Sequence, residues 1–290
     1  MEDQAQKLRE LMKTKPQTGQ TGPTKKTRII TVASGKGGVG KTNLSVNLAI
    51  AYAKIGKKVI VMDADLGLAN VNIMLNVIPK FNLYHVIRKQ KTMREIMIDT
   101  DFGIQILAGA SGFSKIANLS EEERQNFITE LYTLSNADII IIDTSAGVSS
   151  NVLSFIAAAD DAIIITTPEP TAITDAYGII KIIATEVENL NINLKLVVNR
   201  VKTVSDARKI ADRIINISGQ FLNLKVDYLG CIYEDPIVSS SVIRQRPFIV
   251  NDPKSKAAIS VQHLVSRIEK TEFEAEPGIA RLIRKLFGRD

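Results

Sequence analysis

Residues 35–42 read Gly-Lys-Gly-Gly-Val-Gly-Lys-Thr, and they directly follow the apolar run Arg28-Ile-Ile-Thr-Val-Ala-Ser34. This pattern predicts a strand, a glycine-rich turn and the start of a helix, which is the context that a phosphate-binding P-loop requires. Glycine lets the backbone curl so that several N–H groups point at one phosphate, and the helix N-terminus adds positive charge. We expect Lys41 to contact the β- and γ-phosphates of a nucleotide and the Thr42 hydroxyl to hold Mg²⁺. The residues expected to bind the nucleotide in this segment are Gly35, Lys36, Gly37, Gly38, Val39, Gly40, Lys41, Thr42 and Asn43.

The composition indicates one sizeable α/β core. The chain has 290 residues, 45% of them hydrophobic, and a chain of this size can bury such a core without disulfides. Its single cysteine, Cys231, excludes a disulfide framework and a cysteine-cluster metal site within one chain. No apolar segment reaches the length of a membrane span, and the N-terminus lacks the layout of a signal peptide. The expected compartment is the cytoplasm.

The formal net charge of +6 is concentrated at the two ends of the chain. Residues 1–28 hold seven Lys/Arg and three Asp/Glu, residues 277–290 hold four and one, and the stretch between them is close to neutral. A neutral body argues against a large nucleic-acid footprint. The sequence therefore carries no strong nucleic-acid signal, although a local basic patch is compatible with these counts.

Short apolar runs alternate with longer helical patterns along the core. Runs such as Ile139-Ile-Ile-Ile142 are apolar on both faces, as strands buried between two helix layers must be. We predict an α/β fold, a doubly wound, mostly parallel sheet flanked by helices on both faces, in a single domain with helical tails. The expected strands are 28–34, 58–63, 103–108, 138–143, 161–167, 193–199 and 225–232. The expected helices are 43–55, 120–135, 149–158, 171–190, 205–222 and 253–268, with helical pieces through 72–98.

The two ends differ from this core in composition. An N-terminal helix is expected within 1–13, followed by a flexible linker over 14–27 that is rich in Thr, Gly, Pro, Gln and Lys. The P-loop domain is expected over 28–271 and a hinge over 272–277. Residues 278–290 form the last segment, in which helical spacing of apolar residues predicts a short amphipathic helix.

Aspartates close two of the expected buried strands. Val59-Ile-Val-Met-Asp63-Ala-Asp65 ends one of them, and Ile139-Ile-Ile-Ile-Asp143 ends another. In doubly wound sheets the ligand lies off the carboxyl ends of the strands, and a buried carboxylate needs a cation or hydrogen-bond donors. The Mg²⁺ of a bound nucleotide would supply the cation; the alternative is that these are ordinary turn carboxylates at strand ends.

The segment Lys36-Gly-Gly-Val-Gly-Lys-Thr42 resembles the deviant Walker A motif of the MinD/ParA family of dimerising ATPases. The resemblance implies that the chain hydrolyses ATP to ADP and phosphate with Mg²⁺. It also implies that Lys36 reaches the phosphates of a second copy in an ATP-dependent homodimer. Taken alone, Lys36 could instead be a solvated loop lysine. The catalytic residues implied by the resemblance are Lys36, Lys41 and Asp65.

The same resemblance assigns roles to the strand-end residues. Asp143 resembles the Walker B aspartate, and Gly147 resembles a switch glycine that senses the γ-phosphate. The run from Asp63 to Asn70 resembles the family's first switch, in which Asp65 would orient the attacking water and Asp63 would support Mg²⁺ and the loop. Phosphoryl transfer needs an in-line water and neutralisation of the charge on the transferred group. The metal ligands implied are Thr42, Asp65 and Asp143, partly through water.

Base recognition is expected further along the chain. Val197-Val-Asn199-Arg200 ends a strand, and in the family the matching asparagine reads the adenine. Gly230-Cys-Ile-Tyr-Glu-Asp235-Pro236 resembles the family's Gly-x-Ile-Pro-x-Asp stretch beside the adenine, with a tyrosine in place of the first proline. Asn43 likewise stands where the family commonly has a second threonine. The sequence has no Asn-Lys-x-Asp signature for guanine, so ATP is favoured over GTP.

The C-terminal segment has the character of a membrane-surface helix. Its cationic residues surround an apolar stripe, and a short basic amphipathic helix of this type lies on anionic membranes. The alternative is that its apolar face docks on the body or on a partner. We expect peripheral association with the inner face of the cell membrane in the ATP-bound state. The residues expected to enter the membrane are Ile279, Leu282, Ile283, Leu286 and Phe287.

The N-terminal segment Asp3-Gln-Ala-Gln-Lys-Leu-Arg9 resembles the "DQAxxLR" segment of the FlhG (YlxH, FleN) group of flagellar MinD-like ATPases. In that group the segment stimulates FlhF, a flagellar GTPase of the signal-recognition-particle type. The resemblance also implies contacts with the flagellar C-ring proteins. The alternative is an amphipathic helix that folds back on its own body. The residues expected to bind the partner are Asp3, Gln4, Ala5, Leu8 and Arg9.

These expectations favour an ATP-dependent, dimerising, membrane-associating switch that regulates flagellar number and placement. A ParA-type DNA-partitioning ATPase and a MinD-type regulator of the division site are the alternatives. The neutral body makes the first of these less favoured. A metal-cluster carrier of the Mrp type would need a cysteine pair, which the chain lacks. A binding module with an inactive pocket is disfavoured because Lys41, Thr42, Asp65 and Asp143 are all present.

Overall fold

The apolar run Arg28–Ser34 forms β1, and all of its residues are buried. The computed structural model describes residues 27–65, 70–109, 120–187, 192–270 and 282. Within them β1 lies inside an 8-stranded sheet with the order β3-β4-β2-β5-β1-β6-β7-β8. All neighbouring strands are parallel except the β3–β4 pair at one edge. The other strands are β2 (Val59–Ala64), β3 (Met97–Asp99), β4 (Gln105–Ala108), β5 (Ile139–Ala146), β6 (Asp161–Thr166), β7 (Asn193–Val201) and β8 (Asp227–Tyr233).

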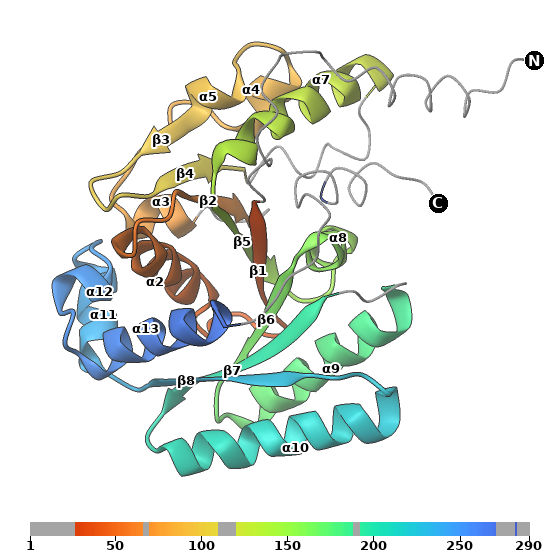
Figure 1. Cartoon of the computed structure of the whole chain (residues 1–290), viewed down its shortest axis with the longest axis vertical. Coiled ribbons are helices and arrows are strands. Elements are labelled where there is room, and N and C mark those ends of the chain that lie inside the picture. The colour runs from red at the N-terminus through yellow and green to blue at the C-terminus, as the bar shows by residue number, and fades with distance from the viewer. Residues whose placement is uncertain (1–26, 66–69, 110–119, 188–191, 271–281, 283–290) are drawn as a thin grey trace, which may run out of the picture.

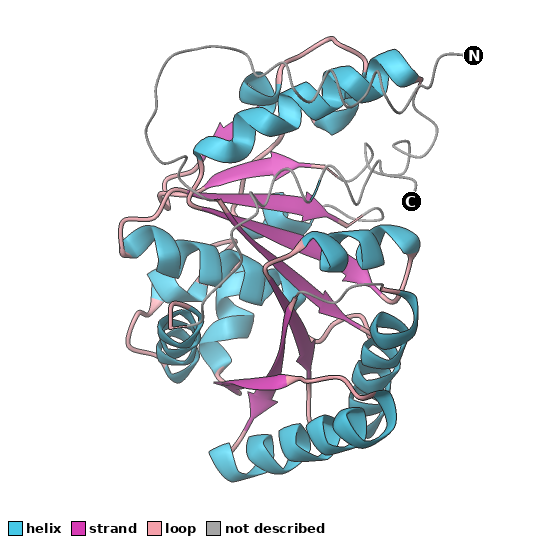
Figure 2. Ribbon diagram, turned by 45° about the vertical axis from the view of Figure 1, so that its right-hand side comes forward, coloured by secondary structure: helices cyan, strands magenta, loops and turns pink. Residues whose placement is uncertain are grey.

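Helices cover both faces of this twisted sheet, as the sequence predicts (Figures 1 and 2). One face packs against α2, α3, α12 and α13, and the other against α4, α5, α7, α8, α9 and α10. The predicted fold class, a doubly wound and mostly parallel sheet, is therefore confirmed. The helices are α2 (Lys41–Lys54), α3 (Asn70–Met74), α4 (Leu83–Ile87), α5 (Met93–Ile96), α7 (Glu121–Tyr132), η2 (Thr133–Asn136), α8 (Ser150–Ala158), α9 (Pro170–Glu186), α10 (Val204–Leu222), α11 (Pro236–Ile243), α12 (Phe248–Asn251) and α13 (Lys256–Ile268).

Most of the long helices begin at a residue whose side chain caps them. Ser149, Thr203 and Ser255 each accept a hydrogen bond from a backbone N–H in the first turn of α8, α10 and α13. Such caps satisfy N–H groups that the helix itself leaves unpaired. α9 begins differently, with Glu169 at the cap position and Pro170 as its first residue. Proline suits this position because its φ is already helical and no N–H is lost from the helix.

Two regions differ from the predicted elements. Residues 97–99 form the antiparallel edge strand β3 instead of continuing a helical piece, and α11 and α12 occupy a stretch for which no element was predicted. The expected helix 253–268 begins at Lys256, after the cap residue Ser255. The expected N-terminal helix, the hinge and the linker up to residue 26 fall outside the described residues, as do the partner-binding positions Asp3, Gln4, Ala5, Leu8 and Arg9. Thr27, the last residue of the expected linker, is instead buried and donates to the backbone oxygens of Ser135 and Ala137.

A buried group of charged residues lies where the strands begin, at the edge opposite the P-loop. The Arg28 Nε is 2.7 Å from Asp161 Oδ2, and Lys195 Nζ is 3.5 Å from the other oxygen of the same carboxylate. Arg28 Nη1 also lies 3.8 Å from Glu269 Oε1, just past the end of α13. Buried charges are tolerated when they are paired in this way. The first and last residues of the sheet domain therefore meet at one place.

Leu282 is the one described residue of the C-terminal segment. It is fully buried in the apolar cluster that includes Leu83 of α4 and Phe127 of α7. In this conformation Leu282 therefore contacts the body, as the docking alternative expects, and this burial removes its side chain from water. Membrane binding of the segment stays a prediction. The other four expected membrane residues, Ile279, Ile283, Leu286 and Phe287, fall outside the described residues. Among the helices that the structure does describe, none has both the length and the apolarity needed to cross a bilayer.

Candidate nucleotide-binding site

The glycine-rich segment lies where the sequence places it, between the carboxyl end of β1 and the first turn of α2. Gly40 is the N-cap residue of α2 and has a φ of 101°, and Gly38 has a φ of 75°. Both values lie in the left-handed region that residues with a side chain rarely adopt. The loop therefore curls around the helix N-terminus, which is the arrangement that binds phosphate groups.

The glycines of the loop serve two different purposes. A Cβ at Gly35 would lie 2.1 Å from the backbone oxygen of Asp175, and a Cβ at Gly40 would lie 2.4 Å from Nδ2 of Asn199. These two positions need glycine because other parts of the chain approach the backbone closely. At Gly37 and Gly38 a Cβ would meet nothing within 4 Å, so that part of the loop is open. The open part is the surface on which a phosphate tail fits.

Lys41 points into the site rather than to solvent. It is buried, and its Nζ donates a hydrogen bond of 2.9 Å to the Ser34 Oγ at the end of β1. Burial lowers the pKa of Lys41, while the nearby carboxylates of Asp143 and Asp65 act in the opposite direction. A partly desolvated ammonium group interacts strongly with a phosphate, since little water competes for it.

Asp63 and Asp143 stand side by side on the neighbouring strands β2 and β5, as register partners. Both are buried. Burial, assisted by the charge of Asp143, raises the pKa of Asp63 to about 7, although the N–H groups of Asp65 and Val71 oppose this shift. Burial also raises the pKa of Asp143 to about 6, opposed by hydrogen bonds from Thr42 and Ser45. Two adjacent buried carboxylates beside a hydroxyl are a donor set that fits Mg²⁺.

The two expected switch segments also reach this site. The N–H of Asp65 donates to Asp63 Oδ1 at 3.1 Å, and Asn70 begins α3; residues 66–69 between them lie outside the described part. Gly147 follows β5 with a φ of 93°, and its N–H donates to the backbone oxygen of Ser34 at 2.9 Å. Each expected switch is therefore hydrogen-bonded to a residue of β1 or β2 beside the P-loop. Sensing of the γ-phosphate stays a prediction.

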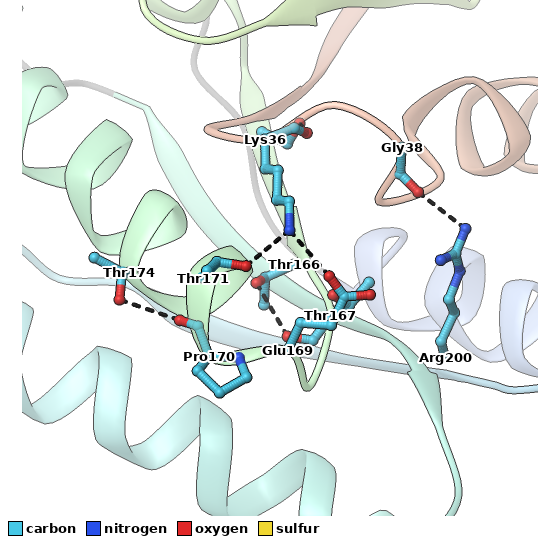
Figure 3. Close-up of polar contacts among 10 residues, drawn as sticks. Lys36, Gly38, Thr166, Thr167, Glu169, Pro170, Thr171, Thr174 and Arg200 are labelled. Atoms are coloured by element: carbon cyan, nitrogen blue, oxygen red, sulfur yellow. Dashed lines mark hydrogen bonds and ion pairs between the residues drawn. The ribbon is translucent and has the colours of Figure 1, made fainter.

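Lys36 has a different environment from Lys41. Its ammonium group is exposed and contacts the start of α9, 3.0 Å from Glu169 Oε2 and 2.7 Å from Thr171 Oγ1 (Figure 3). The Lys36 side chain is therefore held at the start of α9, whereas that of Lys41 is held at the end of β1. The two loop lysines therefore make different contacts within the chain. The role expected for Lys36 in a second copy stays a prediction.

The expected base-reading residues lie beside the P-loop. Asn199 Nδ2 donates to the backbone oxygen of Val39 at 2.8 Å. Arg200 Nη2 donates to the backbone oxygen of Gly38 at 2.9 Å (Figure 3). Asp235 is used structurally: its carboxylate caps α11 through the N–H of Ile237 and also accepts from the N–H of Ala257. Pro236 is the first residue of α11, and Asn43 lies in the first turn of α2.

Sequence comparisons place these features in a known family. Residues 27–196 match a family described as an AAA domain. The chain is 33% identical to the antiactivator FleN of Pseudomonas aeruginosa over 259 residues. This alignment covers 89% of this chain and 92% of FleN. The chain is also 33% identical to the flagellum site-determining protein YlxH of Helicobacter pylori, over 99% of this chain and 98% of that protein. The chain is an FlhG-type ATPase of the MinD/ParA family.

Solved structures agree with this FlhG-type assignment. The septum site-determining protein MinD of Pyrococcus horikoshii, complexed with Mg-ADP, superposes with a TM-score of 0.67 and 27% identity over 84% of this chain and 96% of that one. MinD in the MinC:MinD complex of Aquifex aeolicus superposes with a TM-score of 0.68 and 25% identity. As a member of this family, the FlhG-type chain hydrolyses ATP, and its cofactors by family are ATP or ADP and Mg²⁺.

Several residues of this FlhG-type site were not predicted from the sequence. Ser45 lies three residues after Thr42 in α2, and this spacing places both hydroxyls on one face of the helix. The spacing could therefore have predicted the hydrogen bond from Ser45 to Asp143. Glu169 and Thr171 follow the buried strand β6 directly, as other site residues follow β2 and β5. No sequence pattern predicts the contact of Ser34 with Lys41 or that of Asp175 with Gly35, because these residues meet only in the folded chain.

Proposed function

We propose that this ATPase is a dimerising, membrane-associating switch that regulates flagellar number and placement. The observation that carries the proposal is the 33% identity, over 99% of this chain, to a protein named as flagellum site-determining. The site supports it, because a glycine-rich loop with a buried lysine also carries a second, exposed lysine that is held only by surface contacts with Glu169 and Thr171.

The described residues supply distinct parts of ATP turnover in this proposal. Mg²⁺ would neutralise charge on the β- and γ-phosphates, held by Thr42 and Asp143 and by Asp65 through water. Lys41 and the open loop glycines bind the phosphate tail. Asp65 orients the attacking water, and Asp63 fixes the N–H of Asp65 and so the start of the first switch. In-line placement of water and neutralisation of charge are the two requirements of phosphoryl transfer.

The partner's lysine completes the site in the proposed dimer. Lys36 leaves its contact with Glu169 and reaches the phosphates of the opposing subunit, where it takes the role of an arginine finger. A residue supplied across an interface links hydrolysis to assembly, because the isolated subunit lacks one positive charge at the transferred group.

The two ends of the chain connect this switch to its partners. The segment 3–9 is proposed to stimulate the flagellar GTPase FlhF, and the body to contact proteins of the flagellar C-ring. Residues 278–290 are proposed to bind anionic membrane. One short helix of this kind binds weakly, whereas two helices on an ATP-bound dimer bind together and far more tightly.

A MinD-type regulator of the division site is the second candidate. It is favoured by the structural similarity to the two MinD proteins and by 33% identity to the septum site-determining protein MinD of Bacillus subtilis. The flagellar assignment is preferred because the match to YlxH extends over 99% of this chain, against 82% for that MinD.

The test is ATP turnover measured with and without anionic liposomes, beside a DNA-binding assay. The proposal expects liposomes to retain the protein when ATP is present and to change its turnover. DNA binding with a steep salt dependence and no sedimentation with liposomes would favour the partitioning class instead. Normal liposome binding together with failure of the segment 3–9 to stimulate FlhF would favour the MinD-type role.

A further inference from the structure

The end of β7 departs from regular strand geometry beside the P-loop. The register between β7 and β8 shifts twice, once between Leu196 and Val197 and again between Val198 and Val201. The second shift lies beside the P-loop. The two residues in that gap are Asn199 and Arg200, and Arg200 has a φ of 57°. A non-glycine residue in this left-handed region is unusual, and irregularities of this kind often redirect side chains next to active sites.

Both residues in the gap are bonded to the same part of the loop. Asn199 donates to the carbonyl of Val39 and Arg200 to the carbonyl of Gly38, so two adjacent loop carbonyls are held by two adjacent side chains. The Asn199 amide is itself fixed, because its Oδ1 accepts the N–H of Arg200 at 2.9 Å. The close approach of Asn199 Nδ2 to Gly40 shows that the loop and the strand end fit each other tightly.

These contacts affect the direction of the loop N–H groups. A peptide unit is planar, so a carbonyl held on one side fixes the N–H of the next residue on the other side. Holding the carbonyls of Gly38 and Val39 therefore orients the N–H groups of Val39 and Gly40. Those N–H groups belong to the part of the loop that curls around the phosphate tail.

We propose that Asn199 and Arg200 are positioning residues for the P-loop, so that the strand end expected to read the base also sets the shape of the phosphate cradle. The consequence is that binding of the base and binding of the phosphates are coupled through one pair of side chains. This inference depends on the ATP site and is independent of dimerisation, membrane binding and the flagellar role.

The experiment compares Mg-ATP with Mg-tripolyphosphate, which has the phosphates and lacks the base. Binding of each is measured by calorimetry for the unchanged protein, Arg200→Ala and Asn199→Ala. Arg208→Ala is the matched control, because Arg208 is an exposed arginine of α10 that pairs with Asp212 away from the loop. A net hydrogen bond contributes about 0.5–1.5 kcal/mol, so each site variant is expected to bind tripolyphosphate roughly twofold to tenfold more weakly. The control is expected to match the unchanged protein.

Two results of this comparison would overturn the proposal. If ATP binding weakens and tripolyphosphate binding does not change, the two side chains serve the base alone. If the loss in Arg200→Ala shrinks strongly at high salt, Arg200 contacts a phosphate directly instead of holding a neutral carbonyl.

Hydrogen exchange of the loop amides gives a second measurement that needs no ligand. Exchange at residues 38–41 is expected to be about twofold to tenfold faster in Arg200→Ala than in Arg208→Ala, with the rest of the sheet unchanged. Equal exchange at these amides in the two variants would refute the positioning role. Because the readout is local, a general loss of stability is recognised by faster exchange throughout the sheet.

Discussion

The ammonium group of Lys36 is ion-paired with the carboxylate of Glu169 within one chain, at 3.0 Å. The side chains are 36% and 54% exposed, so solvent screens the pair, and exposed pairs of this kind contribute about 0–1 kcal/mol. Lys36 can therefore leave Glu169 at small cost, which suits a residue proposed to act in a neighbouring subunit. In the single chain, this contact holds Lys36 against α9 of the same chain, and we expect Lys36 to leave it when the dimer forms.

The first prediction concerns this pair. Lys36→Ala is expected to abolish ATP-dependent dimerisation, because the positive charge across the interface is lost. Glu169→Gln is expected to keep dimerisation and to lower the protein concentration for half-assembly by up to about fivefold, since the competing ion pair is removed. Light scattering with a non-hydrolysable ATP analogue measures both effects.

Lys57→Ala is the control, because Lys57 is similarly exposed but pairs with Glu269 at the opposite edge. Weaker assembly of Glu169→Gln would contradict the interpretation that the Lys36–Glu169 ion pair competes with dimerisation.

The second prediction separates binding from hydrolysis. Asp65→Ala is expected to bind ATP and to remain dimeric, because the cradle is intact but the attacking water is no longer oriented. Lys41→Ala is expected to lose ATP-dependent dimerisation, since the buried ammonium group proposed to bind the phosphates is removed. Scattering and phosphate release are measured on the same samples. An Asp65→Ala protein that stays monomeric with ATP would be inconsistent with the role given to Asp65.

The third prediction concerns pH. Without metal or nucleotide, burial raises the pKa of Asp63 to about 7, well above its ordinary value of 3.8. The folded chain then holds a proton that the unfolded chain loses, so stability falls as the pH rises from about 4 to about 7. Asp63→Asn removes this effect and is expected to be more stable than the unchanged protein above pH 7, by an amount on the order of a few kcal/mol.

Urea unfolding at several pH values checks this expectation. The difference in the free energy of unfolding between Asp63→Asn and the unchanged protein should become smaller toward pH 5, where the Asp63 carboxyl is protonated in the folded chain. Mg-ATP should reverse the order, because a cation stabilises the ionised carboxylates. A difference that does not depend on pH would show that Asp63 is ionised in the folded protein.

The fourth prediction concerns the C-terminal segment. Deletion of residues 278–290 is expected to remove binding to anionic liposomes and to spare ATP-dependent dimerisation. Because Leu282 is buried against α4 and α7, the deletion should also expose apolar surface there and lower the melting temperature of the nucleotide-free protein. Co-sedimentation that is unchanged by the deletion would exclude the segment as the membrane anchor.

The parts of this structure that are contiguous in the chain could be predicted from the sequence. The P-loop, its strand and its helix were recognised because one segment holds all three. The buried parallel strands were recognised because their apolar runs are distinctive. β3 was missed because its three residues continue directly from α5. α11 was missed because it is short and contains three consecutive serines.

The contacts that join distant segments could not be predicted in the same way. Asn199 and Val39 are 160 positions apart, and Lys36 and Glu169 are 133 apart. These contacts depend on the order of the strands in the sheet, which places β6 beside β1 and β7 beside β6. For Asp235 the resemblance suggested a place beside the adenine, whereas both carboxylate oxygens accept helix N–H groups.

β1 connects two sites at opposite ends of its own length. It ends in the P-loop, and it begins at Arg28, whose guanidinium lies beside Glu269. A seven-residue strand is about 20 Å long and stiff, because hydrogen bonds to β5 and β6 hold it on both sides. The phosphate loop and the Arg28–Glu269 contact, close to both limits of the described domain, therefore keep a fixed separation, set by a strand that cannot slide without breaking its pairing with both neighbours.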